Sequence, residues 1–126
     1  MFKETVISII IIIFIISLDF ITQNYTKETV ENTTDMLNEL KKQVENDTEE
    51  VSDGLEDVFR KWEERRKILA YFIEHDELEK VETNLTNIKS FINRKEKNLA
   101  ISGIDEANFI LKHIKEKNAF NLENIF

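Results

Sequence analysis

Residues 6–18 read VISIIIIIFIISL, the longest apolar run of the chain, with two serines as its only polar residues. Counting the apolar residues just beyond Asp19, about 16 residues would form roughly 24 Å of α-helix, slightly less than the ~30 Å hydrocarbon core of a bilayer. Flanking threonines and the long side chain of Lys3 would cover part of the difference. The run predicts an N-terminal transmembrane anchor over residues 1–22 that contacts membrane lipid through residues 4–22.

The residues after the apolar run distinguish an anchor from a cleaved signal peptide of similar length. A cleavage site needs small residues at the −3 and −1 positions, with one residue between them, and residues 19–25 (DFITQNY) contain no such pattern. An uncleaved anchor is therefore favoured. Positive charge precedes the run at Lys3 and the amino terminus, whereas acidic residues follow it. The positive-inside rule then predicts a cytoplasmic N-terminus and an extracytoplasmic domain over residues 23–126 in a single-pass cell-membrane protein.

The remaining sequence is typical of an all-α domain. The chain of 126 residues has no proline, no cysteine and only two glycines, so it lacks the turn residues that a sheet-rich fold needs and favours long helices. Apolar residues recur at helical spacing and define four segments. The expected helices are 26–46, 48–74, 77–92 and 94–117, followed by a C-terminal tail over 118–126. Nothing in the sequence separates the anchor from the first of these helices, so the two are expected to form one continuous helix.

Three of the expected helices start at patterns that resemble capping boxes, in which a side chain caps the helix and an acidic residue lies three positions later. These patterns begin at Asp47, Asp76 and Asn93. The short connections between helices predict that consecutive helices are antiparallel neighbours. The predicted core includes Trp62, and the apolar tail residues Phe120, Leu122, Ile125 and Phe126 are expected to fold back onto it.

A weak internal repeat relates the two halves of the domain. Apolar positions between Val30 and Val44 match positions between Leu78 and Ile92 at a shift of 48 residues, and Gly54 matches Gly103 at a shift of 49. The repeat predicts two stacked αα-hairpins, as in a helical-repeat protein or a four-helix bundle.

Few residues suggest chemistry. His75 and Glu79 have the spacing at which a helix presents two metal ligands on one face, but Asp76 and Glu79 are explained by a helix cap and His75 by a helix C-terminus. His113 also lies near a predicted helix end, among lysines. Residues 60–67 (RKWEERRK) resemble a basic patch, but i,i+4 pairs such as Glu56–Arg60, Asp57–Lys61 and Glu63–Lys67 predict a solvated helix face. No metal or cofactor site is predicted.

The charge balance and the absent motifs exclude several function classes. A net charge of −8 gives no general attraction for nucleic acid. No Ser-His-Asp, Cys-His, phosphate-loop or HExxH pattern is present, so we expect neither catalytic residues nor enzymatic activity.

The chain as a whole resembles the bacterial family catalogued as domain of unknown function 4363. The resemblance rests on the N-terminal apolar helix, the mid-chain Trp62, the His75-Asp-Glu junction, the segment 109–114 (FILKHI) and the terminal Asn-Ile-Phe. It implies a membrane-anchored helical protein of Gram-positive bacteria, and it supplies no activity, cofactor or site residue.

The sequence therefore favours an interaction module that binds another membrane or envelope protein of unknown identity. The alternative is an extracytoplasmic ligand- or metal-sensing domain that uses His75.

Overall fold

The computed structural model describes the backbone of residues 1–125 and the side chains of residues 1–119. Four α-helices make up the described chain, and no strand occurs in it. They are α1 (Phe2–Glu45), α2 (Val51–Leu69), α3 (His75–Asn93) and α4 (Lys97–Ile125). The all-α prediction is confirmed.

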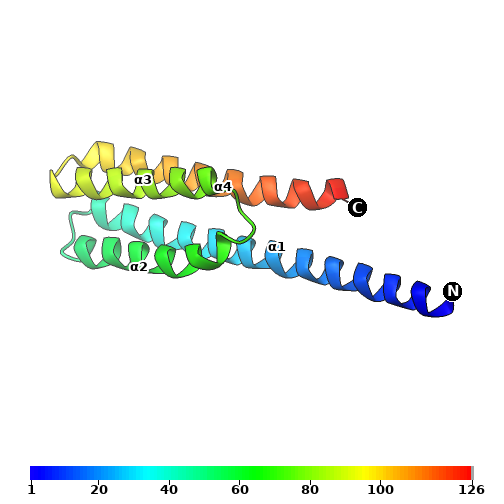
Figure 1. Ribbon diagram of the computed structural model, residues 1–126. Coiled ribbons are helices and arrows are strands. Elements are labelled where there is room, and N and C mark those ends of the chain that lie inside the picture. The colour runs from blue at the N-terminus through cyan, green and yellow to red at the C-terminus, as the bar shows by residue number, and fades with distance from the viewer. Residues whose placement is uncertain (126) are drawn as a thin grey trace.

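The apolar run and the first helix of the domain form one helix, α1, of 44 residues. No proline or glycine occurs before Gly54, so nothing interrupts its hydrogen-bond ladder. At 1.5 Å per residue α1 is about 66 Å long. Its N-terminal part projects beyond the rest of the molecule (Figure 1), and none of its most apolar window of 18 residues is buried inside the protein.

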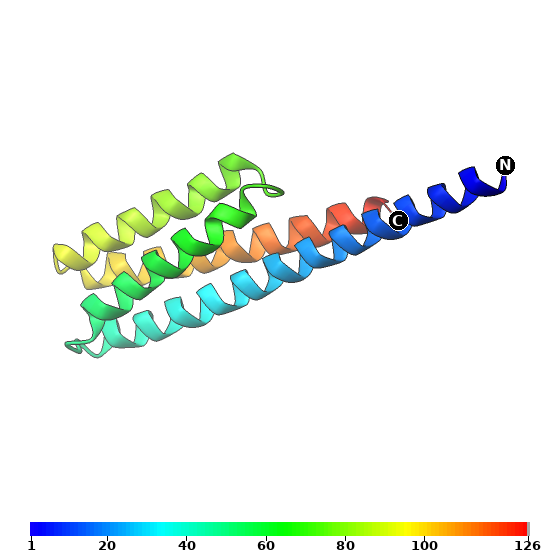
Figure 2. The same cartoon turned by 60° about the horizontal axis from the view of Figure 1, so that its bottom comes forward.

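The helices alternate in direction, and the turns gather at two levels (Figures 1 and 2). Residues 46–50 and 94–96 form two turns at one end of the molecule, called here the distal turns. Residues 70–74 connect α2 and α3 at the opposite level, on the side from which α1 extends towards its N-terminus, and are called the proximal turn. The helix pairs α1–α2, α3–α4 and α1–α4 pack closely, whereas α2 and α3 barely meet.

The predicted apolar faces line one core between the helices. Trp62 is 4 % exposed and belongs to it, as predicted. The buried apolar residues are Val30, Leu37, Leu40, Val44, Leu55, Val58, Trp62, Leu69, Leu78, Val81, Leu85, Ile88, Ala100, Ile104, Ala107, Leu111 and Ile114. Leu99 of α4, despite its apolar side chain, is 48 % exposed. In addition, Thr26, Thr29 and Thr33 are buried on α1, a role that hydropathy alone does not assign to threonine.

The predicted capping boxes are wrong. Asp47 does not start α2; its φ of 51° places it in the left-handed region, where it ends α1. The Thr48 N–H donates to the Gln43 carbonyl at 3.1 Å and the Asp47 N–H donates to the Val44 carbonyl at 3.3 Å, which is a Schellman motif. Backbone capping of the preceding helix therefore prevailed over side-chain capping of the next one.

The start of α4 shows the same correction. Asn93 is the last residue of α3, and Lys95, with φ of 58°, closes a second Schellman motif in which the Glu96 N–H donates to the Phe91 carbonyl at 2.8 Å. Asp76 lies in the first turn of α3 without capping it, and Glu74 occupies the N-cap position with no side-chain hydrogen bond.

These turns support the internal repeat. The two left-handed residues, Asp47 and Lys95, lie 48 positions apart, the shift that relates the apolar patterns. Gly54 of α2 lies against Leu40 and Gln43 of α1, and Gly103 of α4 lies against Ile88 and Phe91 of α3. The two αα-hairpins thus have the same kind of turn, and in each the two helices approach closely at the glycine.

The C-terminal tail is not a separate segment, which corrects the boundary at residue 117. The helix α4 runs on to Ile125, and neither proline nor glycine follows Gly103 to interrupt it. The predicted folding back of Phe120, Leu122, Ile125 and Phe126 concerns side chains outside the described residues.

Candidate functional site

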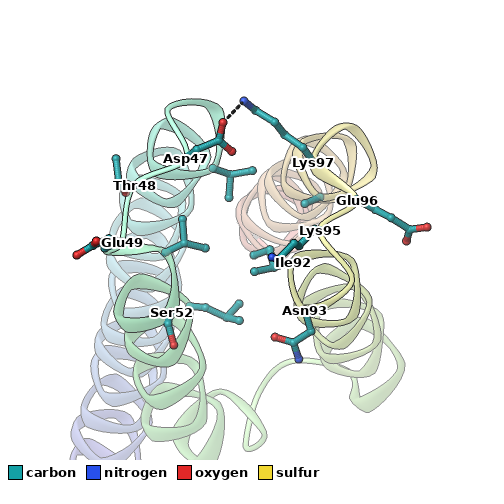
Figure 3. A pocket seen from close by; sticks show the side chains of 13 residues that line it. Asp47, Thr48, Glu49, Ser52, Ile92, Asn93, Lys95, Glu96 and Lys97 are labelled. Carbon is teal, nitrogen blue, oxygen red and sulfur yellow. Dashed lines mark hydrogen bonds and ion pairs between the residues drawn. The ribbon is translucent and has the colours of Figure 1, made fainter.

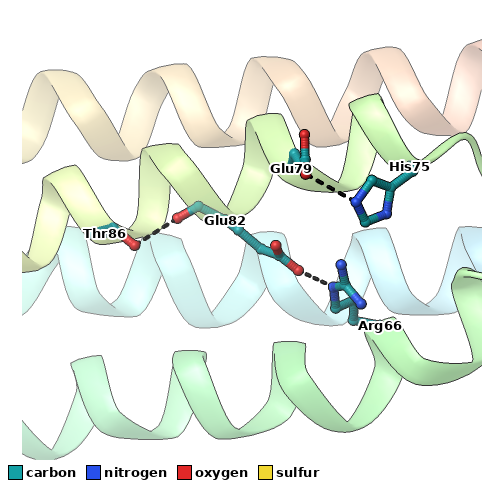
Figure 4. Close-up of polar contacts among 5 residues, drawn as sticks. All are labelled: Arg66, His75, Glu79, Glu82 and Thr86. Carbon is teal, nitrogen blue, oxygen red and sulfur yellow. Dashed lines mark hydrogen bonds and ion pairs between the residues drawn. The ribbon is translucent and has the colours of Figure 1, made fainter.

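His75 and Glu79 lie close together, as their spacing predicts, but they form an isolated pair. The His75 Nε2 atom lies 2.9 Å from Glu79 Oε1 on the outer face of α3, and the two side chains are 65 % and 57 % exposed (Figure 4). Asp76 does not join them. In the described part of the chain no group of three or more histidine, cysteine or acidic side chains gathers in a way that could hold a metal ion. His113 is exposed on α4.

The basic segment of α2 has structural partners. The Arg65 guanidinium lies over the Tyr25 ring of α1 at 5.1 Å, and Arg66 forms an ion pair with Glu82 of α3 (Figure 4). Arg60 pairs with Asp57 at 3.1 Å, an i,i+3 contact, so the predicted Glu56–Arg60 pair is wrong. The solvated-face interpretation of this segment is thus incomplete, because two of its arginines join α2 to neighbouring helices.

Two lysines hold helices together at the edges of the bundle. Lys41 Nζ of α1 lies 2.8 Å from Asp105 Oδ1 of α4, and this hydrogen bond raises the pKa of Lys41 above its ordinary 10.5. Lys117 of α4 lies 3.5 Å from Glu74 and 3.4 Å from Glu77, and the charge of Glu74, then the contact with Glu77, raises the pKa of Lys117. Both lysines are therefore protonated and paired at neutral pH.

A cleft opens at the distal end of the bundle, between the two distal turns (Figure 3). It has a volume of about 550 Å³ and draws residues from all four helices. We call it the distal cleft. Its apolar lining consists of Val44, Val51, Leu55, Ile92 and Ala100. Its polar lining consists of Asp47, Thr48, Glu49, Ser52, Asn93, Lys95, Glu96 and Lys97.

The polar groups of the distal cleft carry both signs of charge. Lys97 Nζ lies 3.2 Å from Asp47 Oδ2, so one ion pair joins the first distal turn to the start of α4 across the cleft (Figure 3). Both side chains are exposed, at 41 % and 79 %, so this pair adds little stability. Two further carboxylates, Glu49 and Glu96, and the cationic Lys95 line the same space. With three carboxylates and two ammonium groups around an apolar centre, the cleft suits a partner surface that carries both signs of charge better than it suits a small ion of one sign.

The distal cleft is not evident in the amino-acid sequence. Its lining residues come from two segments that lie about fifty positions apart, and each segment by itself resembles an ordinary polar turn. The internal repeat was the one available signal, because equivalent turns of two stacked hairpins lie side by side.

The gap between α2 and α3 is smaller and largely closed. A hollow of about 190 Å³ lies there, lined by Phe59, Trp62 and Leu85 among others. The Arg66–Glu82 ion pair spans the gap, and Lys89 Nζ lies 5.6 Å from the centre of the Phe59 ring. These polar bridges leave the distal cleft as the better candidate site.

The fold and the cleft define a class of protein: two αα-hairpins closed into a bundle, with the first helix prolonged by an apolar segment that the bundle leaves uncovered. The chain belongs to the family described as Domain of unknown function (DUF4363), whose model matches residues 20–125. The match begins directly after Asp19 and so covers the bundle without the apolar run. No curated protein and no solved structure matches the chain. The recognised family is confirmed, and its description assigns no activity.

Proposed function

We propose that this chain is a non-enzymatic, single-pass membrane protein that holds its helical bundle on the extracytoplasmic side of a bacterial cell membrane. There the distal cleft binds another envelope protein. The observation that carries the proposal is the position of the cleft, at the far end of the helix that also contains the apolar run.

The apolar part of α1 has the properties of a membrane span. It is long and apolar enough to cross a membrane, a test that a signal sequence also passes. Its polar side chains are satisfied within the helix: the Ser8 hydroxyl donates to the Glu4 carbonyl at 2.9 Å, and the Ser17 hydroxyl donates to the Ile13 carbonyl at 2.8 Å. Such internal bonding is what a lipid environment requires.

The continuity of α1 favours an anchor that stays attached. Proteolytic cleavage favours exposed, irregular segments. Here the residues that follow the apolar run are helical and lead without interruption into the packed part of the bundle. An uncleaved N-terminal helix would keep the domain at the membrane.

The length of α1 sets the height of the distal cleft. From Ile21, at the end of the apolar stretch, to Glu45 the helix rises about 36 Å. The cleft would face away from the bilayer at that height. A partner that reaches it is a protein with an extracytoplasmic part, and the apolar lining of the cleft suits an apolar side chain or short helix of that partner.

In-cell photocrosslinking tests this proposal. A photoreactive amino acid in place of Ser52, which is exposed and lines the cleft, is expected to form an adduct with a discrete envelope protein. The same amino acid in place of Lys67, exposed at the other end of α2, serves as the control and should not form that adduct.

A matched pair of substitutions then tests whether the cleft itself is the binding surface. Val51→Asp places a charge in the apolar lining, and Leu99→Asp places the same charge on an exposed residue outside it. Both positions lie in the first turn of a helix, where aspartate is favourable. The Ser52 adduct should disappear with Val51→Asp and persist with Leu99→Asp. Equal adducts at Ser52 and Lys67, or equal effects of the two substitutions, would refute the proposal.

The alternative function is a ligand- or metal-sensing domain, and the exposed His75–Glu79 pair is the observation that favours it. A divalent metal that raises the melting temperature of the protein, with the rise lost in His75→Ala and kept in His113→Ala, would support sensing. An equal rise in all three proteins would argue against a site at His75.

A further inference from the structure

We infer that the proximal turn, residues 70–74, rests in the lipid headgroup layer of the membrane that α1 enters, with the ring of Tyr71 among the headgroups. The inference rests on the anchor in the proposed function. It concerns a second contact with the bilayer, made by a part of the bundle that lies about fifty residues from the anchor in sequence.

Contacts with α1 fix the height of the proximal turn. The Tyr25 ring of α1 packs edge-on against the Phe72 ring, with centroids 6.2 Å apart and planes at 82°. Arg65, near the end of α2, covers the same tyrosine ring at 5.1 Å. The proximal turn is therefore level with Tyr25.

The level of Tyr25 is close to the end of the apolar stretch. Ile21 lies four residues earlier on the same unbroken helix, about 6 Å along its axis. The headgroup region adds about 5–7 Å to each side of the hydrocarbon core. A span that ends near Ile21 thus brings the proximal turn to the headgroups.

The helix α4 reaches the same level. Its register against α1 is constant: Lys41 contacts Asp105, Asn38 contacts Asn108 and Glu31 contacts Lys115. Continued along both helices, this register sets the end of α4 level with Ile21. The proximal turn and the end of α4 thus lie on the side towards the apolar run (Figures 1 and 2).

The exposed surface of the proximal turn suits a membrane interface. Tyr71 is 89 % exposed and Ile68, just before the turn, is 48 % exposed. Residues 70–73 (AYFI) carry no charge. Tyrosine is enriched at the level of the headgroups because its ring is apolar and its hydroxyl is polar.

The charges around the turn are balanced, which indicates the kind of lipid contact. Three basic residues at 65–67 precede the turn and three acidic residues, Glu74, Asp76 and Glu77, lie at its end and just beyond it, so the formal charges of residues 65–77 cancel. Attraction to anionic lipid therefore contributes little, and the contact depends on inserting an aromatic ring rather than on charge. The proximal turn should therefore contact zwitterionic and anionic membranes equally well.

The chain contains no cysteine, so single labels can be placed without altering native thiols. Tyr71→Cys, Glu49→Cys and Ile21→Cys variants of the full-length chain would each carry the fluorophore NBD. They would be reconstituted in phosphatidylcholine vesicles, with and without phosphatidylglycerol, that contain a lipid with a nitroxide on its headgroup. All three positions are exposed within the protein, so the fold should persist, as circular dichroism would check.

The label at Tyr71 is expected to lose most of its emission, as the label at Ile21 does, whereas the label at Glu49 in a distal turn keeps its emission. The inference would be overturned if the Tyr71 label kept its emission as the Glu49 label does, or if it were shielded from water without being quenched by the nitroxide lipid. In either case a quenched Ile21 label would still support the anchor. An unquenched Ile21 label would overturn both.

Discussion

The two glycines of the chain occupy equivalent places in the two hairpins, yet alanine should affect stability in opposite directions at the two sites. A methyl carbon at Gly103 would lie 2.9 Å from Ile88 Cγ1, well inside the 3.5–4.0 Å at which carbon atoms attract each other. Ile88 is fully buried within the core. The Gly103 carbonyl also accepts a 2.7 Å hydrogen bond from Asn84 Nδ2, which a shift of α4 would strain.

The expected magnitude follows from three contributions. Alanine favours a helix interior over glycine by about 1 kcal/mol. Overpacking of a filled core costs about 1–3 kcal/mol, and weakening one buried hydrogen bond costs about 1 kcal/mol. The Gly103→Ala substitution should therefore lower the free energy of unfolding by about 1–3 kcal/mol.

At Gly54 the same substitution meets a different obstacle. The atom too close to the new methyl group is Oε1 of Gln43, the far end of a flexible side chain that has no hydrogen-bond partner to lose. The next contact, Leu40 Cδ1 at 3.4 Å, is nearly ordinary. Gly54→Ala should therefore gain most of the helix propensity and raise the free energy of unfolding by about 0.5–1 kcal/mol.

Urea unfolding of the full-length protein in detergent, followed by circular dichroism, measures both changes as shifts of the midpoint at constant slope. An Ile88→Ala background removes the obstructing atom, so Gly103→Ala should become neutral or stabilising there. Shifts of the same sign at the two glycines, or an undiminished cost in the Ile88→Ala background, would refute the argument.

Two further predictions concern the distal turns and the lysine at the bundle edge. Lys95→Gly and Asp47→Gly should each stabilise the protein, by up to about 1 kcal/mol, because glycine adopts a left-handed conformation without strain. The gain should be larger at Lys95, since aspartate tolerates that region better than lysine. A lower melting temperature in either variant would contradict the prediction. Glu74 and Glu77 raise the pKa of Lys117, so the ion pairs of Lys117 contribute fully to stability below pH 10.5, and this contribution is lost as the pH rises through the higher folded-state pKa. Across that alkaline range the melting temperature should fall less in Lys117→Gln than in the native chain. An equal fall in both proteins would rule out this contribution.

Much of the fold follows from local patterns. The 3.6-residue period identified the core faces, including Trp62, because burial of an amphipathic face is decided within each helix. The missing proline and the late first glycine allowed α1 to continue from the apolar run into the bundle. The repeat of 48–49 residues, weak as a pattern, corresponds to two hairpins with the same Schellman turn at Asp47 and Lys95.

Helix ends were predicted less well because two capping devices compete for the same residues. Asp47 can cap the next helix with its carboxylate or end the preceding helix with its backbone, and the sequence shows both possibilities. The backbone motif prevailed where it satisfied the carbonyls of Gln43 and Val44. At the C-terminus, α4 continued past the last clear apolar period, where no proline or glycine interrupts the helix.

By itself the sequence determined that this protein is helical, that its first segment is apolar enough to span a membrane, and which apolar residues form most of each buried face. These properties depend on spacing along one chain. Only the tertiary structure decided which surfaces meet: the distal cleft between two distant turns, the contact of Gly103 with Ile88, and the level of Tyr71 beside Tyr25. Those depend on the register between helices, which side-chain packing sets and no local pattern encodes.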